Sequence, residues 1–219
     1  MSAETKNIFK FLSETYDGRY KLNTIFHTFE MCSKDKSHDR SLVNSNITCI
    51  NFDKLNEWIH GYNLPQSADS MTFSDRYVYF IEFKAGDQVG HEKKRDKLIR
   101  GVIGKINDSD DTLHSCICSR IEGFNADNIK TRFYLVVDTK EMGIFPLAAA
   151  LASLSEGPST VADPHMAQLI QYVLPNLKAE VDHPEHFDDI NIWYSDLFDR
   201  YLLTHHIHDI DKLFVNDQE

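Results

Sequence analysis

The sequence predicts an α/β fold in which a central mixed β-sheet is flanked by helices. Short runs rich in aromatic and β-branched residues, such as 77–84 and 132–138, are typical of buried strands. A longer segment, 90–106, carries apolar residues every three or four positions, which is typical of an amphipathic helix. Strand and helix patterns alternate in the middle of the chain, as expected when helices cover a sheet.

The composition indicates a globular protein. The chain has 219 residues, enough for one domain with extensions, and its hydrophobic content of 42% argues against disorder. The longest apolar run, 143–155, is shorter than the roughly 20 residues of a membrane span, and the N-terminus lacks a signal-peptide core. We therefore expect a cytoplasmic protein that has no membrane partner. The four cysteines are expected to be reduced and buried.

Three segments are expected along the chain. Residues 1–46 hold two helices and a polar loop, 33–46, to which we assign no chemistry. Residues 47–140 form the core, and residues 141–219 form a helical C-terminal extension packed on it. The two N-terminal helices are indicated by apolar residues at helical spacing: Ile8, Phe9, Leu12 and Tyr16, then Leu22, Ile25, Phe26 and Phe29.

The core is predicted element by element from its apolar patterns and its turn residues. Its expected elements are a strand at 48–52, a helix at 53–61 with Asp53 as N-cap, a hairpin of 67–73 and 77–84, a helix at 90–106 and a strand at 132–138. Residues 112–120 fit either strand or helix. The extension is expected to contain helices at 144–154, 163–177 and 190–203.

The second strand of the hairpin carries two charges in an apolar setting. Alternation places Val78, Phe80, Glu82 and Lys84 on one face, and Tyr77, Tyr79, Ile81 and Phe83 on the other. Both faces are apolar, as in a central strand. A buried charge without a partner costs several kcal/mol, so Glu82 and Lys84 need partners or a position where the face opens to solvent.

The hairpin register supplies a partner for Glu82. A symmetric loop centred between Asp75 and Arg76 pairs Asp69 with Glu82, with Cβ atoms roughly 5 Å apart. Two carboxylates at that distance repel each other unless a cation lies between them, and Mg²⁺ or Mn²⁺ prefers such oxygen ligands. Lys84 would then lie beside a metal-bound water, where it can orient the nucleophile or offset phosphate charge.

This arrangement of Asp69 and Glu82-Phe83-Lys84 at the end of an apolar strand, followed by a basic helix and another strand, resembles the PD-(D/E)xK nuclease superfamily. Ala68 stands where the family pattern has proline. The resemblance implies a restriction-endonuclease-like core, metal ligation by Asp69 and Glu82, and a catalytic role for Lys84. It also suggests a further acidic ligand from an early helix, Glu57 ahead of Glu14, although solvated helix glutamates are common.

The helix after the hairpin concentrates basic residues beside the predicted site. We expect a phosphate track from four of them, Lys93, Lys94, Lys97 and Arg100. A solvated basic helix face is the alternative. The formal net charge of −11 excludes a protein that coats nucleic acid non-specifically, so contact with nucleic acid must be local or made through an assembly.

The predicted function is a metal-dependent nuclease with Mg²⁺ or Mn²⁺ as cofactor and DNA as the favoured substrate. The alternative is a non-catalytic protein-binding or assembly module on the same fold, in which Lys84 only forms a salt bridge. The acidic net charge favours a homo-oligomer or a protein partner. Two histidine-rich stretches, 183–186 and 205–208, are interpreted as structural or adventitious. The chain has no motif for ATP, dinucleotide or serine-hydrolase chemistry.

Overall fold

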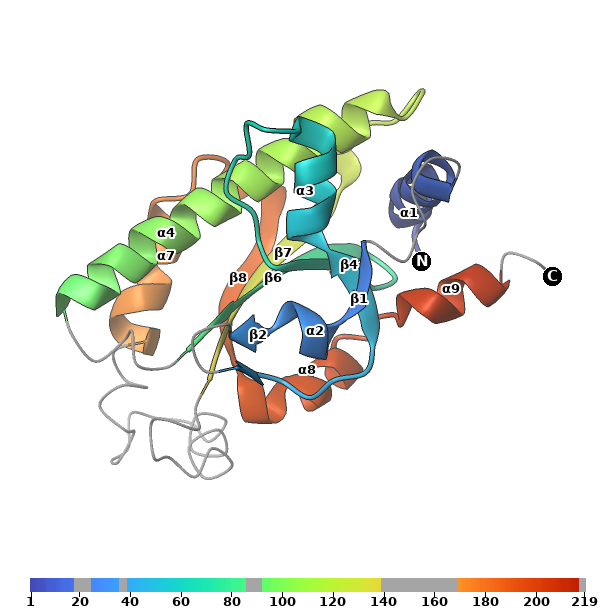
Figure 1. Ribbon diagram of the computed structural model, residues 1–219. Helices are drawn as coiled ribbons and strands as arrows, with labels where there is room; N and C mark the ends of the chain where they lie inside the picture. The colour runs from blue at the N-terminus through green and yellow to red at the C-terminus, as the bar shows by residue number, and fades with distance from the viewer. Residues whose placement is uncertain (18–24, 36–38, 86–91, 139–168, 217–219) are drawn as a thin grey trace.

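A computed structural model describes residues 1–17, 25–35, 39–85, 92–138 and 169–216. Within these residues six strands form one mixed sheet in the order β1-β4-β5-β6-β7-β8 (Figure 1). Neighbouring strands are antiparallel from β1 to β6 and parallel from β6 to β8. The strands are β1 Phe26–Thr28, β4 Thr48–Asn51, β5 Ser70–Phe73, β6 Tyr77–Lys84, β7 Lys130–Val137 and β8 Phe187–Tyr194. The predicted mixed sheet flanked by helices is therefore confirmed.

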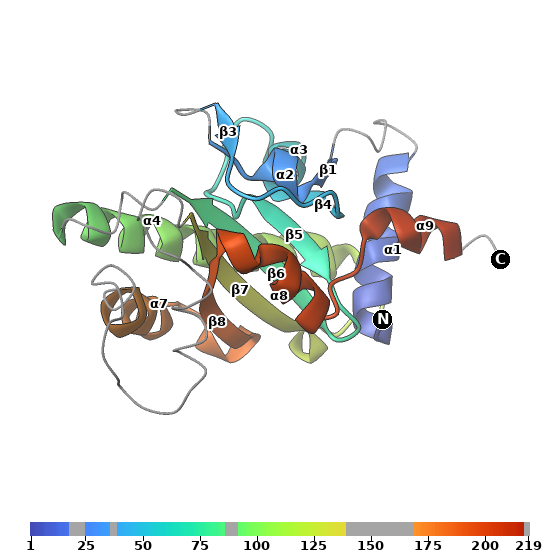
Figure 2. The same cartoon turned by 90° about the horizontal axis from the view of Figure 1, so that it is seen from below.

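Helices cover both faces of this sheet. Figure 1 shows α3 and α4 on one side and α2 and α8 on the other, and Figure 2 shows α8 crossing the face of β6 and β7. The described helices are α1 Ala3–Asp17, α2 Phe29–Cys32, α3 Phe52–His60, α4 Glu92–Asp111, α7 Leu174–Ala179, α8 Phe198–Thr204 and α9 Ile210–Asn216. None of them is long and apolar enough to cross a membrane.

The central strand β6 is buried on both faces. Val78 and Phe80 belong to the apolar cluster beneath α3 and α4, whereas Tyr79 and Ile81 belong to the cluster beneath α2 and α8. The predicted alternation is therefore confirmed. Antiparallel pairing to β5 from Val78 to Ile81 and parallel pairing to β7 along the whole strand place hydrogen-bonding partners on both edges of the middle of β6.

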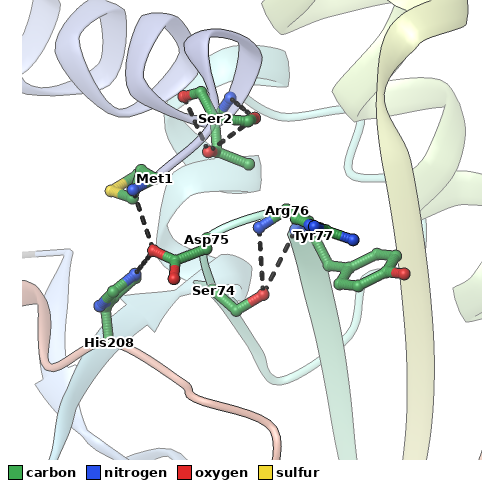
Figure 3. A network of polar contacts seen from close by, with 8 residues as sticks. Met1, Ser2, Ser74, Asp75, Arg76, Tyr77 and His208 are labelled. Atoms are coloured by element: carbon green, nitrogen blue, oxygen red, sulfur yellow. Dashed lines mark hydrogen bonds and ion pairs between the residues drawn. The ribbon is translucent and has the colours of Figure 1, made fainter.

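The hairpin has the predicted register. Met71 pairs with Phe80 and Phe73 with Val78, and the Ser74 N–H donates to the Tyr77 carbonyl at 3.0 Å, which leaves Asp75 and Arg76 as the loop. Figure 3 shows this loop held from two sides, because the amino group of Met1 (2.9 Å) and His208 Nε2 (3.0 Å) both contact Asp75 Oδ1. These contacts lower the pKa of Asp75.

The N-terminal segment differs from the prediction. The helix α1 is confirmed, but the second apolar series belongs in part to a strand, because Phe26–Thr28 pairs with β4. The first residue of that series, Leu22, lies outside the described residues. The polar loop holds a two-stranded ribbon, β2 Lys34–Asp35 and β3 Arg40–Ser41, followed by Leu42 and Val43, which are buried in the second apolar cluster.

The prediction of a wholly helical C-terminal extension is wrong. Residues Phe187–Tyr194 form β8, which pairs in parallel with β7, and only the later part of the predicted helix 190–203 is helical, as α8. The apolar residues Ile190 and Ile192 face one side of the sheet and Trp193 the other. The predicted helix 144–154 and the start of the helix 163–177 lie outside the described residues.

Other predicted elements are confirmed with shifted ends. The helix α4 continues to Asp111, and the undecided segment is helical, as a π-helix Thr112–Ile117 and a 3₁₀ turn Cys118–Arg120. The N-cap of α3 is Asn51, whose side chain accepts from the Lys54 N–H at 3.0 Å, so the assignment of Asp53 as N-cap is wrong. The four cysteines are free. Cys49 and Cys118 are buried as expected, but Cys32 and Cys116 are partly exposed.

The ribbon β2–β3 is tied to the end of the sheet by a buried ion pair. Asp138, directly after β7, is fully buried, and its Oδ2 lies 2.7 Å from Arg40 on β3. Ser195 Oγ donates to Asp138 Oδ1 at 3.1 Å. The segment that was assigned no chemistry therefore supplies the counter-charge of a buried carboxylate.

We expect Arg40→Met to lower the free energy of unfolding by about 3 kcal/mol, because it removes the guanidinium that pairs with the buried Asp138 carboxylate. Chemical denaturation measures this change. Lys34→Met is the matched control, because Lys34 pairs with Asp39 on the exposed side of the same ribbon and should cost about 1 kcal/mol or less. Equal effects of the two variants would contradict the structural role of Arg40.

Candidate active site

The predicted pair of carboxylates lies at the carboxyl end of β6. The ladder between β5 and β6 ends at Ser70 and Ile81, and the next residues in the same register are Asp69 and Glu82. Asp69 Oδ2 accepts from the Phe83 N–H at 2.7 Å, which fixes the Asp69 side chain against β6. The structure therefore brings together the two carboxylates that the hairpin register predicted.

Glu82 is fully buried, and a lysine contacts each of its oxygens. Lys84, two residues on and on the same face, forms an ion pair with Oε1, and Lys105 from α4 lies 2.7 Å from Oε2. Both lysines keep partial exposure, 25% for the Lys84 side chain and 21% for that of Lys105. The carboxylate is thus inside the protein while its cations reach toward solvent.

Lys105 is the cation between the two carboxylates. Its Nζ lies 3.3 Å from Asp69 Oδ1 as well as 2.7 Å from Glu82 Oε2. Burial by itself would lower the pKa of Lys105, but the charges of Glu82 and Asp69 outweigh burial and raise that pKa. Lys105 is not among the site residues that the sequence predicts. Its position three residues after the buried Val102 was the available signal, since that spacing places it beside the face of α4 that packs on the sheet.

The surroundings of Asp69 disfavour its charged form. Burial, followed by the charge of Glu82, raises the pKa of Asp69 to about 7, although Lys105 and Lys84 act in the opposite direction. A carboxyl group that titrates near neutral pH beside a second carboxylate is typical of functional sites. It is also the expected consequence of burying one carboxylate beside another.

A third carboxylate, Asp53, lies close by and was missed as a site residue. The Phe52 N–H donates to the Asp69 carbonyl at 3.2 Å, so the start of α3 adjoins Asp69, and Ser67 Oγ donates to Asp53 Oδ1 at 2.5 Å. Burial raises the pKa of Asp53, and the charge of Asp69 adds to the shift. The carboxylate oxygens of Asp53, Asp69 and Glu82 do not all lie within 4.8 Å of one another. Asp53 is therefore too far away to bind the same metal ion directly as the other two.

The acids expected from early helices lie elsewhere. Glu57 is half-exposed on α3 and pairs with Lys54 at 3.2 Å, and Glu14 is exposed on α1 near Lys10 at 3.7 Å. Within the described part of the chain, neither Glu57 nor Glu14 has a hydrogen bond or ion pair with Asp69 or Glu82. Asp53, one turn before Glu57, is the acid of α3 that faces the site.

A lysine-lined pocket of about 410 Å³ opens beside Glu82. Four lysines line it together with Gln66, Leu98 and Gly101: Lys84, Lys94, Lys97 and Lys105. Of the predicted phosphate track, Lys94 and Lys97 therefore reach this pocket. Lys93 and Arg100 are exposed on α4 but do not line it. Positive charge is concentrated here in a chain whose net charge is −11.

No protein-family model, curated protein or solved structure matches this chain. Its chemistry must therefore be inferred from the arrangement of its own residues. Two carboxylates offer oxygen ligands to a hard divalent cation, and the lysine-lined pocket offers a position for a phosphate. These side chains are therefore of the types that phosphodiester hydrolysis uses. They also form ion pairs with one another, so that the two lysines balance the two carboxylates.

The stability of Asp69→Asn separates a functional carboxylate from a structural one. Because the pKa of Asp69 rises from 3.8 to about 7 on folding, the free energy of unfolding falls as pH increases through this window and stays low above it. We expect Asp69→Asn, which cannot ionise, to be about 1–2 kcal/mol more stable than wild type near pH 8. This gain should vanish near pH 4, where wild-type Asp69 is also neutral.

Denaturant titrations at both pH values test this expectation. Asp188→Asn is the control, because Asp188 pairs with Arg132 near the surface, where loss of the charge should not stabilise the protein. A loss of stability for Asp69→Asn near pH 8 would mean that the Asp69 carboxylate serves chiefly as a structural partner of Lys105.

Proposed function

We propose that this protein is a metal-dependent nuclease that hydrolyses phosphodiester bonds of nucleic acid, with DNA as the favoured substrate. The observation that carries the proposal is the convergence of Asp69, Glu82 and Lys84 at one strand end, beside a pocket lined by lysines. Each residue type has a use in phosphodiester hydrolysis, and all three come together through the β5–β6 hairpin.

Asp69 and Glu82 would hold the metal ion, Mg²⁺ or Mn²⁺. Such an ion, when bound, supplies positive charge to the phosphate and lowers the pKa of a coordinated water. The residues fit this role because Glu82 Oε2 and Asp69 Oδ1 converge on one cation. In the structure that cation is the ammonium of Lys105, whose Nζ lies 2.7 Å from Glu82 Oε2 and 3.3 Å from Asp69 Oδ1. Mg²⁺ commonly uses only one or two protein carboxylates and completes its shell with water and phosphate.

The lysines of the pocket would act on the attacking water and on the phosphate groups of the substrate. Lys84 neighbours Glu82 on the strand and opens into the pocket, where it can orient the attacking water or offset charge on the phosphate. Lys94 and Lys97 line the same pocket from α4, where they can hold the phosphate backbone. The concentration of positive charge in this pocket explains how an acidic protein can bind a polyanion locally.

The order of elements supports membership of the PD-(D/E)xK superfamily. The series α3, β5, β6, α4 and β7 has the order helix, strand, strand, helix, strand that the resemblance implies, with the acidic and basic residues at the expected strand. The additional acid that the resemblance implies, Glu57, does not join them, because it pairs with Lys54 on the exposed side of α3. The restriction-endonuclease-like core remains part of the proposal.

A second candidate is a protein-binding module without catalysis. It is favoured by Lys105, which supplies a cation to both carboxylates and so balances charge without any metal. The net charge of −11 also suits a protein that works through protein contacts. In this case the group of Asp69, Glu82, Lys84 and Lys105, here called the Asp69 cluster, would only fasten α4 to the sheet.

Titration with Mn²⁺ or Mg²⁺ tests metal binding by Asp69. We expect wild type to bind with a dissociation constant of about micromolar to millimolar, and Asp69→Ala to abolish binding, because Glu82 alone, with Lys84 and Lys105 against it, attracts a divalent ion weakly. Calorimetry measures the affinity, and Asp188→Ala provides the control at a carboxylate outside the site. Wild type that binds no divalent ion would favour the module.

Cleavage of a panel of single- and double-stranded DNA and RNA tests the role of Lys84. We expect Lys84→Ala to retain metal binding but to lose cleavage by about 100-fold or more, because a group that acts on developing charge is removed. Lys54→Ala should cleave normally, since Lys54 pairs with Glu57 on the exposed side of α3. An undiminished rate in Lys84→Ala would assign the attacking water to another group.

A further inference from the structure

A second cluster of titratable side chains lies at the far end of α4. Asp110 is in the last turn of this helix, His114 follows in the π-helix Thr112–Ile117, and His186 lies in the 3₁₀ turn before β8. The three side chains place one potential ligand atom each within 4.8 Å of one another. Among the described residues, only this group and one that shares His186 meet this condition.

The contacts within the cluster are close. His186 Nδ1 lies 2.6 Å from Asp110 Oδ2, His114 Nε2 lies 3.4 Å from Asp110 Oδ1, and the rings of His114 and His186 stack with centroids 4.1 Å apart. The Asp110 carboxylate thus has one imidazole at each oxygen. These residues belong to neither the Asp69 cluster nor the lysine-lined pocket.

The inner part of the cluster is buried and incompletely hydrogen-bonded. The Asp110 side chain is only 2% exposed, and Asp110 Oδ1 and His114 Nε2 are both buried without a hydrogen-bond partner. A buried polar atom without a hydrogen bond costs about 1–3 kcal/mol relative to a satisfied one. A ligand bound to both atoms would satisfy them together, because they lie 3.4 Å apart.

We propose that Asp110, His114 and His186 form a binding site for a divalent transition-metal ion of the zinc class. The separation of 3.4 Å between Asp110 Oδ1 and His114 Nε2 equals the edge of a zinc tetrahedron, about 3.3–3.4 Å for bonds of 2.0–2.1 Å. His186 needs a small rotation of its partly exposed ring, because a ligand atom 2.6 Å from Asp110 Oδ2 is too close for a tetrahedral edge.

The donor set selects zinc over magnesium. Imidazole nitrogen suits Zn²⁺, Ni²⁺ and Co²⁺, whereas Mg²⁺ requires an octahedral shell of oxygens. The site is therefore distinct in chemistry from Asp69 and Glu82, and each proposal stands without the other.

A metal at this position would join two parts of the chain that are distant in sequence. Asp110 and His186 are 76 positions apart, and the Thr131 hydroxyl donates to the His186 carbonyl, so the same turn also adjoins β7. The ion would fasten the end of α4 to the start of the edge strand β8. The second group, His183, Glu185 and His186, is exposed and lacks buried members, so the proposal does not include it.

Titration of chelator-treated protein with Zn²⁺, in competition with a metal-binding dye, tests the site. We expect one tight equivalent, a rise in Tm on saturation, and a visible Co²⁺ spectrum of the tetrahedral type. Asp110→Asn and His114→Gln should each weaken Zn²⁺ binding by about 10-fold or more. Both substitutions nearly preserve side-chain size, and circular dichroism verifies that the variants are folded.

His208→Gln is the matched control, because it removes an imidazole from another Asp–His contact, with Asp75 at 3.0 Å, and should leave the tight equivalent unchanged. Asp69→Asn should also leave it unchanged. Absence of a tight equivalent or of a Tm rise in wild type would overturn the proposal, as would tight binding that both cluster variants retain. The group would then be a hydrogen-bonded cluster only.

Discussion

The buried carboxylate of Glu82 is the constraint on which the site and its surroundings depend. A carboxylate without solvent requires counter-charges at both oxygens, and the protein provides Lys84 from the same strand and Lys105 from the helix that covers it. Lys105 reaches Glu82 only if α4 packs across β6. Formation of the ion cluster and packing of α4 on the sheet therefore stabilise each other. The negative charge of Asp69 is unfavourable beside Glu82, which is why the pKa of Asp69 is raised.

The position of the cluster follows from the pattern of the sheet. Along β6 the side chains beneath α4 change from Val78 and Phe80 to Glu82 and Lys84, so the strand passes from apolar core to a polar end within one face. The lysine-lined pocket opens at this end, where solvent can reach Lys84 and Lys105. Ligands commonly bind beyond the carboxyl ends of strands, because side chains there remain attached to a rigid sheet while water and substrate have access.

The helix α4 connects most of the chemistry described for this protein. Its first half supplies Lys94 and Lys97 to the pocket, its middle supplies Lys105, and its last turn supplies Asp110 to the histidine cluster. Apolar residues that pack on the sheet, Leu98, Val102 and Ile106, alternate with these polar ones at helical spacing. One amphipathic helix can thus hold a basic surface and two charged clusters in fixed relation, since its buried stripe sets its rotation.

Local features follow from the amino-acid pattern alone: strand β6 with its two faces, the hairpin loop at Asp75 and Arg76, and hence the pairing of Asp69 with Glu82. They do so because a strand alternates with a period of two and a short loop fixes the register. The identity of β8 and the partners Asp53, Lys105 and His186 depend instead on contacts between distant parts of the chain. The apolar residues of 190–203 fit a helix as well as a strand until β7 offers an edge for pairing. Periodicity tells which face of an element is buried, whereas the neighbour on that face depends on contacts between residues distant in sequence.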